Sequence, residues 1–198
     1  FSTKFSCESY GDYNEVLEND QIDAVYISLP PSLQEKWIMK AIKMNKHIIC
    51  EKPSTLSIKS ANTIIKECKK AGADAVKFQM WRANDLYDSS HPNWKEIQKS
   101  EITFEKAKTL KKFADQQKIE FFCSAFYPEA INMLERLNVK KYKIASRTCL
   151  FKDPFSLETL ISKAKTKKPI IVSMGMGGNK QKIKSIFWKL ELIWGIRY

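Results

Sequence analysis

Metal-ligating residue types and glycine are scarce in this chain of 198 residues. Its two histidines, His47 and His91, lie far apart without metal-ligand spacing, so each is better explained as structural or exposed than as catalytic. The five cysteines form no C-x-x-C pair and their number is odd, which argues against a disulfide framework or a thiolate metal site. The sequence therefore predicts no metal ligands of this kind and a reducing, cytoplasmic compartment.

Long apolar runs and acidic residues are also in short supply. No apolar run approaches the roughly 20 residues of a membrane-spanning helix, so we expect no membrane segment. Lysine and arginine (34) outnumber aspartate and glutamate (22), which gives a net charge of +12. The lysines are spread over nearly every expected helix, without a zinc-finger or RNP-type motif. We therefore expect solvated faces and a basic pocket for anionic substrates, and no nucleic-acid partner.

Apolar, strand-like runs alternate with amphipathic, helix-like segments almost without a break. The runs lie at residues 24–29, 47–50, 74–78, 120–123, 142–145 and 169–172. They are continuously apolar, as in parallel sheets that helices cover. This succession predicts a parallel α/β fold. A further helix is expected over residues 57–72. The polar stretch 81–100 is too long for a routine connection, so we expect a functional loop there.

Polar side chains close the strand-like runs in the second half of the chain. They are Lys77 and Gln79, then Ser124, then Lys143 with Ser146, and finally Ser173. Because parallel strands end at the same edge of a sheet, we expect these groups to converge on one site. Two ammonium groups with several hydroxyls suit a ligand that carries phosphate or carboxylate. The alternative is that the serines only cap the following helices and the lysines reach into solvent.

Lys77 has a further consequence, because it lies within an apolar run. Burying an ammonium group costs several kcal/mol unless an anion meets it. In a strand, Lys77 and Gln79 point the same way, because side chains alternate with period two. We therefore expect Lys77 to be buried beside Gln79 at the floor of the site.

A family resemblance rests on segments of the second half. They are GADAVKFQ (72–79), EIT (101–103), FCSAF (122–126), YKIAS (142–146) and KPIIVSMGM (168–176). Together they resemble the N-terminal barrel of the sialic-acid synthases, over about residues 61–179. The resemblance implies a (β/α) TIM-type barrel enzyme that condenses phosphoenolpyruvate with an N-acyl hexosamine. It also implies a divalent metal cofactor, Mn or Mg, that activates the sugar aldehyde.

The same resemblance implies roles for single residues. Those that would bind phosphoenolpyruvate are Ser124, Lys143, Ser146 and Ser173, and those that would line the shared catalytic pocket are Lys77 and Gln79. The chain departs from the family in two places, where Tyr127 replaces an acidic residue and Met174 replaces a threonine. The first barrel strand, the metal-binding histidines and the C-terminal antifreeze-like domain of the family are absent. The metal ligands are therefore expected to be missing here.

The N-terminal part resembles a different family. IDAVYISLPP (22–31) and KHIICEKP (46–53) look like the Gfo/Idh/MocA oxidoreductases, over about residues 10–60. This implies an NAD(P)-dependent sugar oxidoreductase, with Lys52 near the nicotinamide and Pro30 and Glu51 near the cofactor. The G-x-G-x-x-G loop that would cradle the pyrophosphate is missing. Gln34 stands where that family usually has a histidine.

These observations predict two joined segments, a partial Rossmann-like nucleotide-binding segment (1–58) and a partial synthase-like barrel (59–198). The seam is expected inside the helix over 57–72. Three functions stay open: an N-acylneuraminate-type synthase that is incomplete in this chain, an NAD(P)-dependent sugar oxidoreductase, and an inactive chimeric fragment. The expected partners are the small-molecule substrates phosphoenolpyruvate and an N-acyl hexosamine. A homodimer is an open alternative for the assembly.

Overall fold

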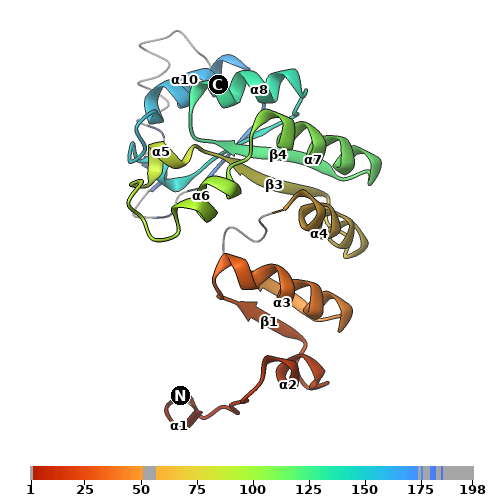
Figure 1. Cartoon of the computed structure of the whole chain (residues 1–198). Helices are drawn as coiled ribbons and strands as arrows, with labels where there is room; N and C mark the ends of the chain where they lie inside the picture. The colour runs from red at the N-terminus through yellow and green to blue at the C-terminus, as the bar shows by residue number, and fades with distance from the viewer. Residues whose placement is uncertain (1, 51–56, 174, 176–178, 182–183, 185–198) are drawn as a thin grey trace. The chain divides into compact units, whose positions relative to one another are not determined.

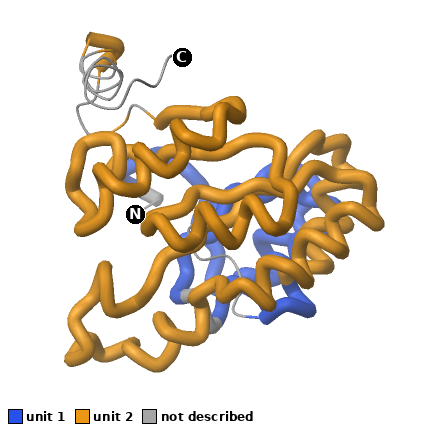
Figure 2. The backbone as a smooth tube through the Cα atoms, turned by 90° about the horizontal axis from the view of Figure 1, so that it is seen from above, with its two compact units in different colours: residues 1–60 blue, residues 61–198 orange. Residues whose placement is uncertain are grey.

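The computed structural model describes residues 2–50, 57–173, 175, 179–181 and 184 (Figure 1). The chain divides into two compact units, residues 1–60 and 61–198 (Figure 2). The boundary falls near the start of helix α4 (Ile58–Lys70), within the range where the sequence predicts a helix. Gly72 follows this helix with a φ of 84°, a conformation that glycine adopts without steric cost. The identity of the segments 1–58 and 59–198 as partial domains stays a prediction.

The first unit is built on a pair of parallel strands. Its elements are α1 (Ser2–Phe5), α2 (Tyr13–Glu18), β1 (Ala24–Ile27), α3 (Pro31–Lys43) and β2 (His47–Cys50). Helix α2 begins after Asp12, whose carboxylate accepts a hydrogen bond from the backbone N–H of Asn14 at 2.7 Å. Helix α3 starts with a proline, whose fixed φ suits the first helical position. It packs on both strands and buries Ile38 and Ala41.

The second unit is a parallel sheet flanked by helices. After α4 its elements are β3 (Ala75–Met80), α5 (Ala83–Leu86), α6 (Trp94–Ser100), α7 (Phe104–Gln116), β4 (Glu120–Ala125), α8 (Pro128–Arg136), β5 (Tyr142–Ile144), α9 (Ser146–Cys149), α10 (Ser156–Lys165) and β6 (Ile170–Val172). The strand order is β3-β4-β5-β6, and each neighbouring pair is parallel. Strands that follow one another in chain order are typical of a (β/α) barrel. The predicted parallel α/β fold is confirmed.

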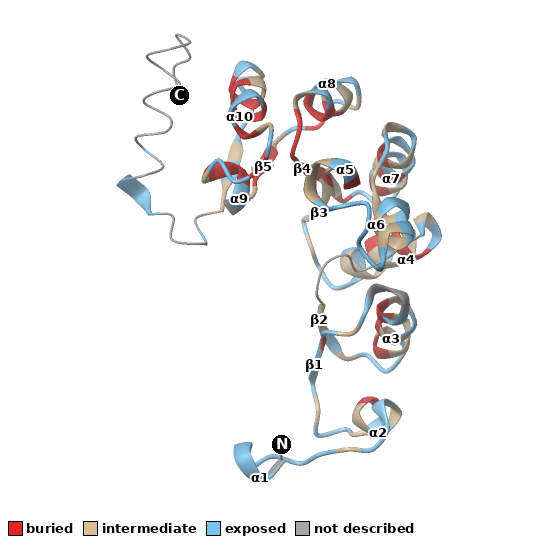
Figure 3. Ribbon diagram, turned by 60° about the vertical axis from the view of Figure 1, so that its left-hand side comes forward, coloured by how far each residue is buried: buried red, intermediate tan, exposed pale blue. Residues whose placement is uncertain are grey.

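One face of this sheet carries the core of the second unit. Strand residues on this face include Val76, Phe121, Cys123, Tyr142 and Ile144, all of which are buried. Helices α7 and α8 pack on β4, and Leu160 and Ile161 of α10 join a cluster with Ile144. Figure 3 shows the buried residues gathered in β4, β5 and parts of α7, α8 and α10. The helix-covered face is therefore apolar, which leaves the other face for polar groups.

The sequence predicts a functional loop over residues 81–100, and the structure shows that this stretch contains regular elements. The short helices α5 and α6 lie within it. Glu101 contributes to this order, because its carboxylate accepts a hydrogen bond from the backbone N–H of Ala83 at the start of α5. Among the described helices, none is long and apolar enough to cross a membrane.

Candidate anion site at the carboxyl edge of the second sheet

Gln79, Ser124 and Lys143 form a row across three neighbouring strands. The strand register places Gln79 opposite Ser124 and Ser124 opposite Lys143. Adjacent strands lie about 4.8 Å apart, and residues in register point to the same side of a parallel sheet. All three side chains therefore share the face opposite the apolar core. The structure brings these predicted site residues together.

Ser146, Ser173 and Gly175 lie one step beyond this row, at the carboxyl ends of β5 and β6. The backbone N–H of Ser173 donates to the carbonyl of Ile144 at 3.0 Å, which ties the segment after β6 to β5. A Cβ atom on Gly175 would lie only 3.0 Å from Oγ of Ser146. The hydroxyls at positions 146 and 173 therefore gather at the same sheet edge as Gln79, Ser124 and Lys143. Met174 lies outside the described residues.

These side chains differ in their access to solvent. Ser124 is 1% exposed, whereas Gln79, Lys143, Ser146 and Ser173 are partly exposed. Lys77 is exposed, so the prediction that it is buried is wrong. It lies opposite Phe122, one row nearer the amino ends of the strands, on the same face as Gln79. An exposed ammonium group carries no large desolvation cost, so that argument for a role of Lys77 does not hold. Its position on the same face as Gln79 agrees with the prediction.

Lys163 of α10 is a residue of this site region that the sequence analysis missed. Its side chain is fully buried, with 0% exposure. The ammonium Nζ donates to the carbonyl of Ala125 at 2.8 Å and to the carbonyl of Lys143 at 3.0 Å. It therefore binds together the carboxyl ends of β4 and β5 on the apolar side of the sheet, behind Ser124 and Lys143.

The environment of Lys163 changes its protonation. Burial lowers the pKa of its ammonium group to about 7, and the nearby Asp153 carboxylate acts in the opposite direction. Near neutral pH this side chain therefore exchanges between its charged and neutral forms. A sequence signal was present, because Lys163 lies three residues after Leu160 and four after Thr159, which are both buried. Read alone, a lysine in a lysine-rich chain looks like a surface residue.

Asp153 fixes the short helix that carries Ser146. Its carboxylate accepts hydrogen bonds from Nε of Arg147 at 2.9 Å and from Oγ1 of Thr148 at 2.8 Å. Its backbone exchanges hydrogen bonds with the Ser156 hydroxyl at the start of α10. Asp153 therefore links α9 to α10, and it thereby helps to hold Ser146 in place.

Arg82 lies at the same edge of the sheet, two residues after the end of β3. Its guanidinium lies over the rings of Tyr127 at 4.3 Å and Phe155 at 5.1 Å, and its Nε donates to Asp85 at 2.6 Å. The hydrogen bond with Asp85 is the main cause that raises the pKa of Arg82. Tyr127 stands at a position where the sequence departs from the synthase pattern. Here its ring serves as a packing surface for a cation.

The metal that the synthase resemblance implies does not fit the residues of this structure. Over the described ranges, no three His, Cys, Asp or Glu side chains come together as a metal site requires. The carboxyl edge presents amide, hydroxyl and ammonium groups, of which the ammonium groups repel a cation. We therefore derive no step through a metal.

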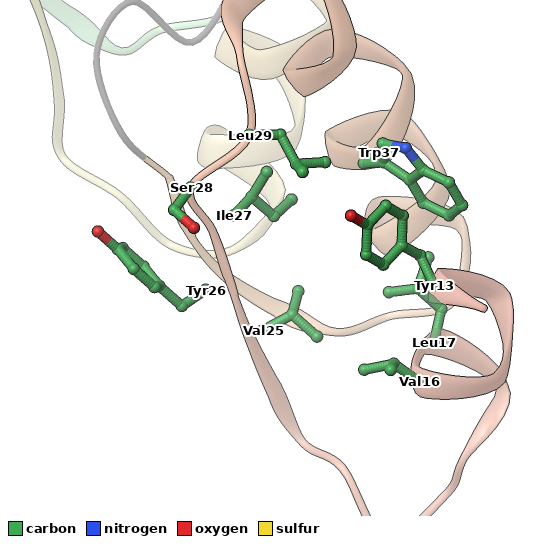
Figure 4. A pocket seen from close by; sticks show the side chains of 9 residues that line it. All are labelled: Tyr13, Val16, Leu17, Val25, Tyr26, Ile27, Ser28, Leu29 and Trp37. Carbon is green, nitrogen blue, oxygen red and sulfur yellow. The ribbon is translucent and has the colours of Figure 1, made fainter. Parts of the chain in front are cut away.

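The residues that the oxidoreductase resemblance places near a dinucleotide cofactor belong to the first unit. Pro30 is the exposed N-cap residue of α3, while Glu51 and Lys52 lie outside the described residues. A pocket of about 220 Å³ opens nearby between α2, β1 and α3 (Figure 4). Its lining residues are Tyr13, Val16, Leu17, Val25, Tyr26, Ile27, Ser28, Leu29 and Trp37. Among the residues that the structure describes, the lining holds no cationic side chain, and ligand pockets usually enclose about 300–1,000 Å³. The pocket therefore does not fit a dinucleotide with its pyrophosphate.

Comparison with known proteins divides the chain in the same way. Residues 64–189, more than half of the chain, match the model of the NeuB family. Residues 1–78 match the model of an oxidoreductase family with an NAD-binding Rossmann fold. The two matches overlap over residues 64–78, which hold the second half of α4 and the first part of β3. Both resemblances found in the sequence are thus confirmed.

Individual relatives cover parts of the chain. One similar structure is that of N-acetylneuraminic acid (sialic acid) synthetase from Leptospira borgpetersenii serovar Hardjo-bovis, in complex with citrate. It is 26% identical in sequence and has a TM-score of 0.54. The match covers 68% of this chain and 46% of the synthetase chain. An uncharacterized oxidoreductase, ORF334, of Rhizobium meliloti is 36% identical over 97 residues, which are 48% of this chain and 27% of the relative. The dTDP-3,4-didehydro-2,6-dideoxy-alpha-D-glucose 3-reductase of Saccharopolyspora spinosa is 46% identical over 55 residues, which are 28% of this chain and 17% of the relative. The chain thus spans about a quarter or less of these curated relatives and about half of the synthetase.

Proposed function

Because this chain belongs to the NeuB family, matched over residues 64–189, we propose that its second unit is the phosphoenolpyruvate-binding part of an N-acylneuraminate-type synthase. Family membership supports a role in sugar biosynthesis. The observation that carries the finer proposal is the row of Gln79, Ser124 and Lys143 at the carboxyl edge of the sheet. Active sites of barrel enzymes lie at this edge.

The chemistry of the edge suits phosphoenolpyruvate, which carries a phosphate and a carboxylate. In this proposal the Lys143 ammonium supplies positive charge, and the hydroxyls of Ser124, Ser146 and Ser173 donate hydrogen bonds to the anionic oxygens. The synthetase from Leptospira was solved in complex with citrate, which also carries carboxylates. That complex supports an anion-binding role for the shared fold.

The reaction proposed for the complete site joins two substrates. C3 of phosphoenolpyruvate forms a bond to the aldehyde carbon of an N-acyl hexosamine, water adds at C2 and phosphate leaves. Lys77 and Gln79 lie on the same face of β3 and would line the catalytic side of the pocket that receives the sugar. The described residues would bind and orient the substrates.

Direct measurement of binding tests this proposal. Two variants each remove one lysine charge, one at the site and one away from it. Phosphoenolpyruvate is titrated calorimetrically into the wild-type chain, Lys143→Ala and Lys140→Ala. Lys140 is exposed and precedes β5, at the opposite edge of the sheet. A charge-assisted hydrogen bond contributes about 1.5–3 kcal/mol, so Lys143→Ala is expected to weaken binding by roughly 10- to 100-fold. Lys140→Ala is expected to bind as the wild type does. Equal affinity of all three proteins would refute the site.

A second candidate, the sugar oxidoreductase, is favoured by the match of residues 1–78 and by the reductase from Saccharopolyspora. The apolar pocket of the first unit weighs against it. Trp37 is the tryptophan of the first unit, so NADH bound to that unit would quench its fluorescence. Quenching that Trp37→Phe abolishes would support this function. Failure of both NADH and phosphoenolpyruvate to bind would support the inactive fragment.

A further inference from the structure

Lys163 lies behind the proposed anion site, on the apolar side of the sheet. Its ammonium group is buried on the apolar side of the sheet and bonds to the carbonyl of Lys143 and to that of Ala125, the residue after Ser124. Lys143 and Ser124 present their side chains on the opposite side. The same stretch of backbone therefore separates a buried cation from the place where an anion would bind.

We propose that Lys163 is a positioning residue that couples anion binding to its own protonation, by holding the ends of β4 and β5 and by placing a positive charge beneath them. This inference rests on the proposed phosphoenolpyruvate site. When the ammonium is charged, it attracts the anion through the sheet. When it is neutral, this attraction is lost.

Two titratable groups act electrostatically on Lys163, the Asp153 carboxylate before α10 and the Cys123 thiol of β4. The helices packed against α10 carry further charged groups, which are Arg147 of α9 and Glu129, Glu135 and Arg136 of α8, and strand β5, whose Lys143 carbonyl binds the ammonium, carries Tyr142 and Lys143. Burial raises the pKa of the Cys123 thiol to about 12 and also raises the pKa of Tyr142, so neither gains charge near neutrality. Asp153 is bonded to Arg147, and Glu135 is bonded to Lys168 and Tyr142. Lys163 itself has a pKa of about 7.

The size of the coupling follows from the distance across the sheet. A bound anion and the ammonium would lie on opposite sides of one sheet, each within a hydrogen bond or a short side chain of the backbone, at a separation of roughly 10 Å. At an effective dielectric constant of about 20, a unit charge at this distance changes affinity by on the order of tenfold. Thermodynamic linkage is reciprocal, so the anion must raise the pKa of Lys163 by the corresponding amount.

The test measures phosphoenolpyruvate affinity of the full chain between about pH 6 and pH 9, for the wild type, Lys163→Met and Lys163→Arg. The phosphate of the ligand titrates as well, so the quantity compared at each pH is the ratio of wild-type to variant affinity. We expect the wild type to bind about tenfold more tightly than Lys163→Met at low pH, with the advantage lost at high pH. Lys163→Arg keeps its charge throughout, so it should match the wild type at low pH and exceed it at high pH.

A second measurement does not depend on a variant that folds. Carbon-13 labelling of the lysine Cε positions lets NMR follow the titration of the buried lysine in the wild-type chain. Saturating phosphoenolpyruvate should raise its pKa by about one unit, the tenfold coupling above. An unchanged pKa in the presence of bound ligand, or a ratio of wild-type to Lys163→Met affinity that stays constant with pH, would overturn the inference alone. No binding of phosphoenolpyruvate to the wild type at any pH would overturn both the inference and the proposed function.

Discussion

Replacing Lys163 by methionine is expected to change how the stability of the chain depends on pH. Methionine keeps the approximate length of the side chain but cannot carry charge. In the folded chain, burial lowers the pKa of Lys163 from 10.5 to about 7. In the unfolded chain the lysine is solvated and keeps its ordinary pKa. Between these two values the unfolded state holds a proton that the folded state has released.

Thermodynamic linkage determines whether the free energy of unfolding rises or falls with pH. Stability rises with pH wherever the unfolded state binds more protons, so the wild type should gain stability from about pH 7 upward. Each pH unit contributes about 1.4 kcal/mol, so at pH 9 the gain is about 3 kcal/mol relative to pH 7. Below pH 7 both states are protonated, and the contribution of Lys163 no longer changes with pH. Lys163→Met lacks this pH-dependent gain altogether.

The variant also loses two hydrogen bonds to backbone carbonyls. This loss costs about 1–3 kcal/mol, and it shifts the whole curve by an amount that does not follow the titration. The slope of the free energy of unfolding against pH therefore reports the charge effect, and the constant offset reports the loss of the hydrogen bonds. Urea unfolding of the wild type and Lys163→Met across this pH range measures the difference in free energy of unfolding. Lys165→Met is the control, because Lys165 lies on the same helix but is exposed.

We expect the difference in free energy of unfolding between the wild type and Lys163→Met to be constant below about pH 7. Above pH 7 it should shift in favour of the wild type by about 1.4 kcal/mol per pH unit. Lys165→Met should follow the wild type in parallel. Parallel curves for the wild type and Lys163→Met would refute the argument that Lys163 loses its proton near neutrality in the folded chain.

Two other predictions concern neighbours of the site. Gly175→Ala is expected to weaken phosphoenolpyruvate binding, because its Cβ would lie 3.0 Å from Oγ of Ser146 and displace that hydroxyl. Calorimetry on Gly175→Ala and on Gly175→Ala with Ser146→Gly checks this, and equal affinity of the wild type and the single variant would contradict it. Asp153→Asn is expected to lower the free energy of unfolding by about 1–3 kcal/mol, because it removes the charge of a buried carboxylate that accepts hydrogen bonds from the half-exposed Arg147 and from Thr148. Urea unfolding measures the loss, and a loss below about 0.5 kcal/mol would show that the pair contributes little.

The order of elements in the second unit could be predicted from the sequence because buried parallel strands are continuously apolar. The convergence of Ser124 and Lys143 followed from that order, since parallel strands end at a common edge. The register that places Gln79 opposite Ser124 could not be predicted. It depends on β3 and β4 pairing as far as Met80 and Ala125, beyond the apolar runs.

Two residues show where local sequence patterns mislead. Lys77 lies in an apolar run but is exposed, on an edge strand of the described sheet and on the face opposite the buried Val76 and Met80. Lys163 lies in a lysine-rich helix but is fully buried, because two strand-end carbonyls accept its hydrogen bonds. In both cases tertiary packing decides burial. The sequence around each residue describes only its own element.

Binding of phosphoenolpyruvate through Lys143 at the carboxyl edge of the second sheet is the proposal on which the others depend. Calorimetric titration of phosphoenolpyruvate into the wild type, Lys143→Ala and Lys140→Ala tests it most directly. We expect saturable binding to the wild type and Lys140→Ala, and binding at least about tenfold weaker to Lys143→Ala. Absence of binding to the wild type, or undiminished binding to Lys143→Ala, would contradict it.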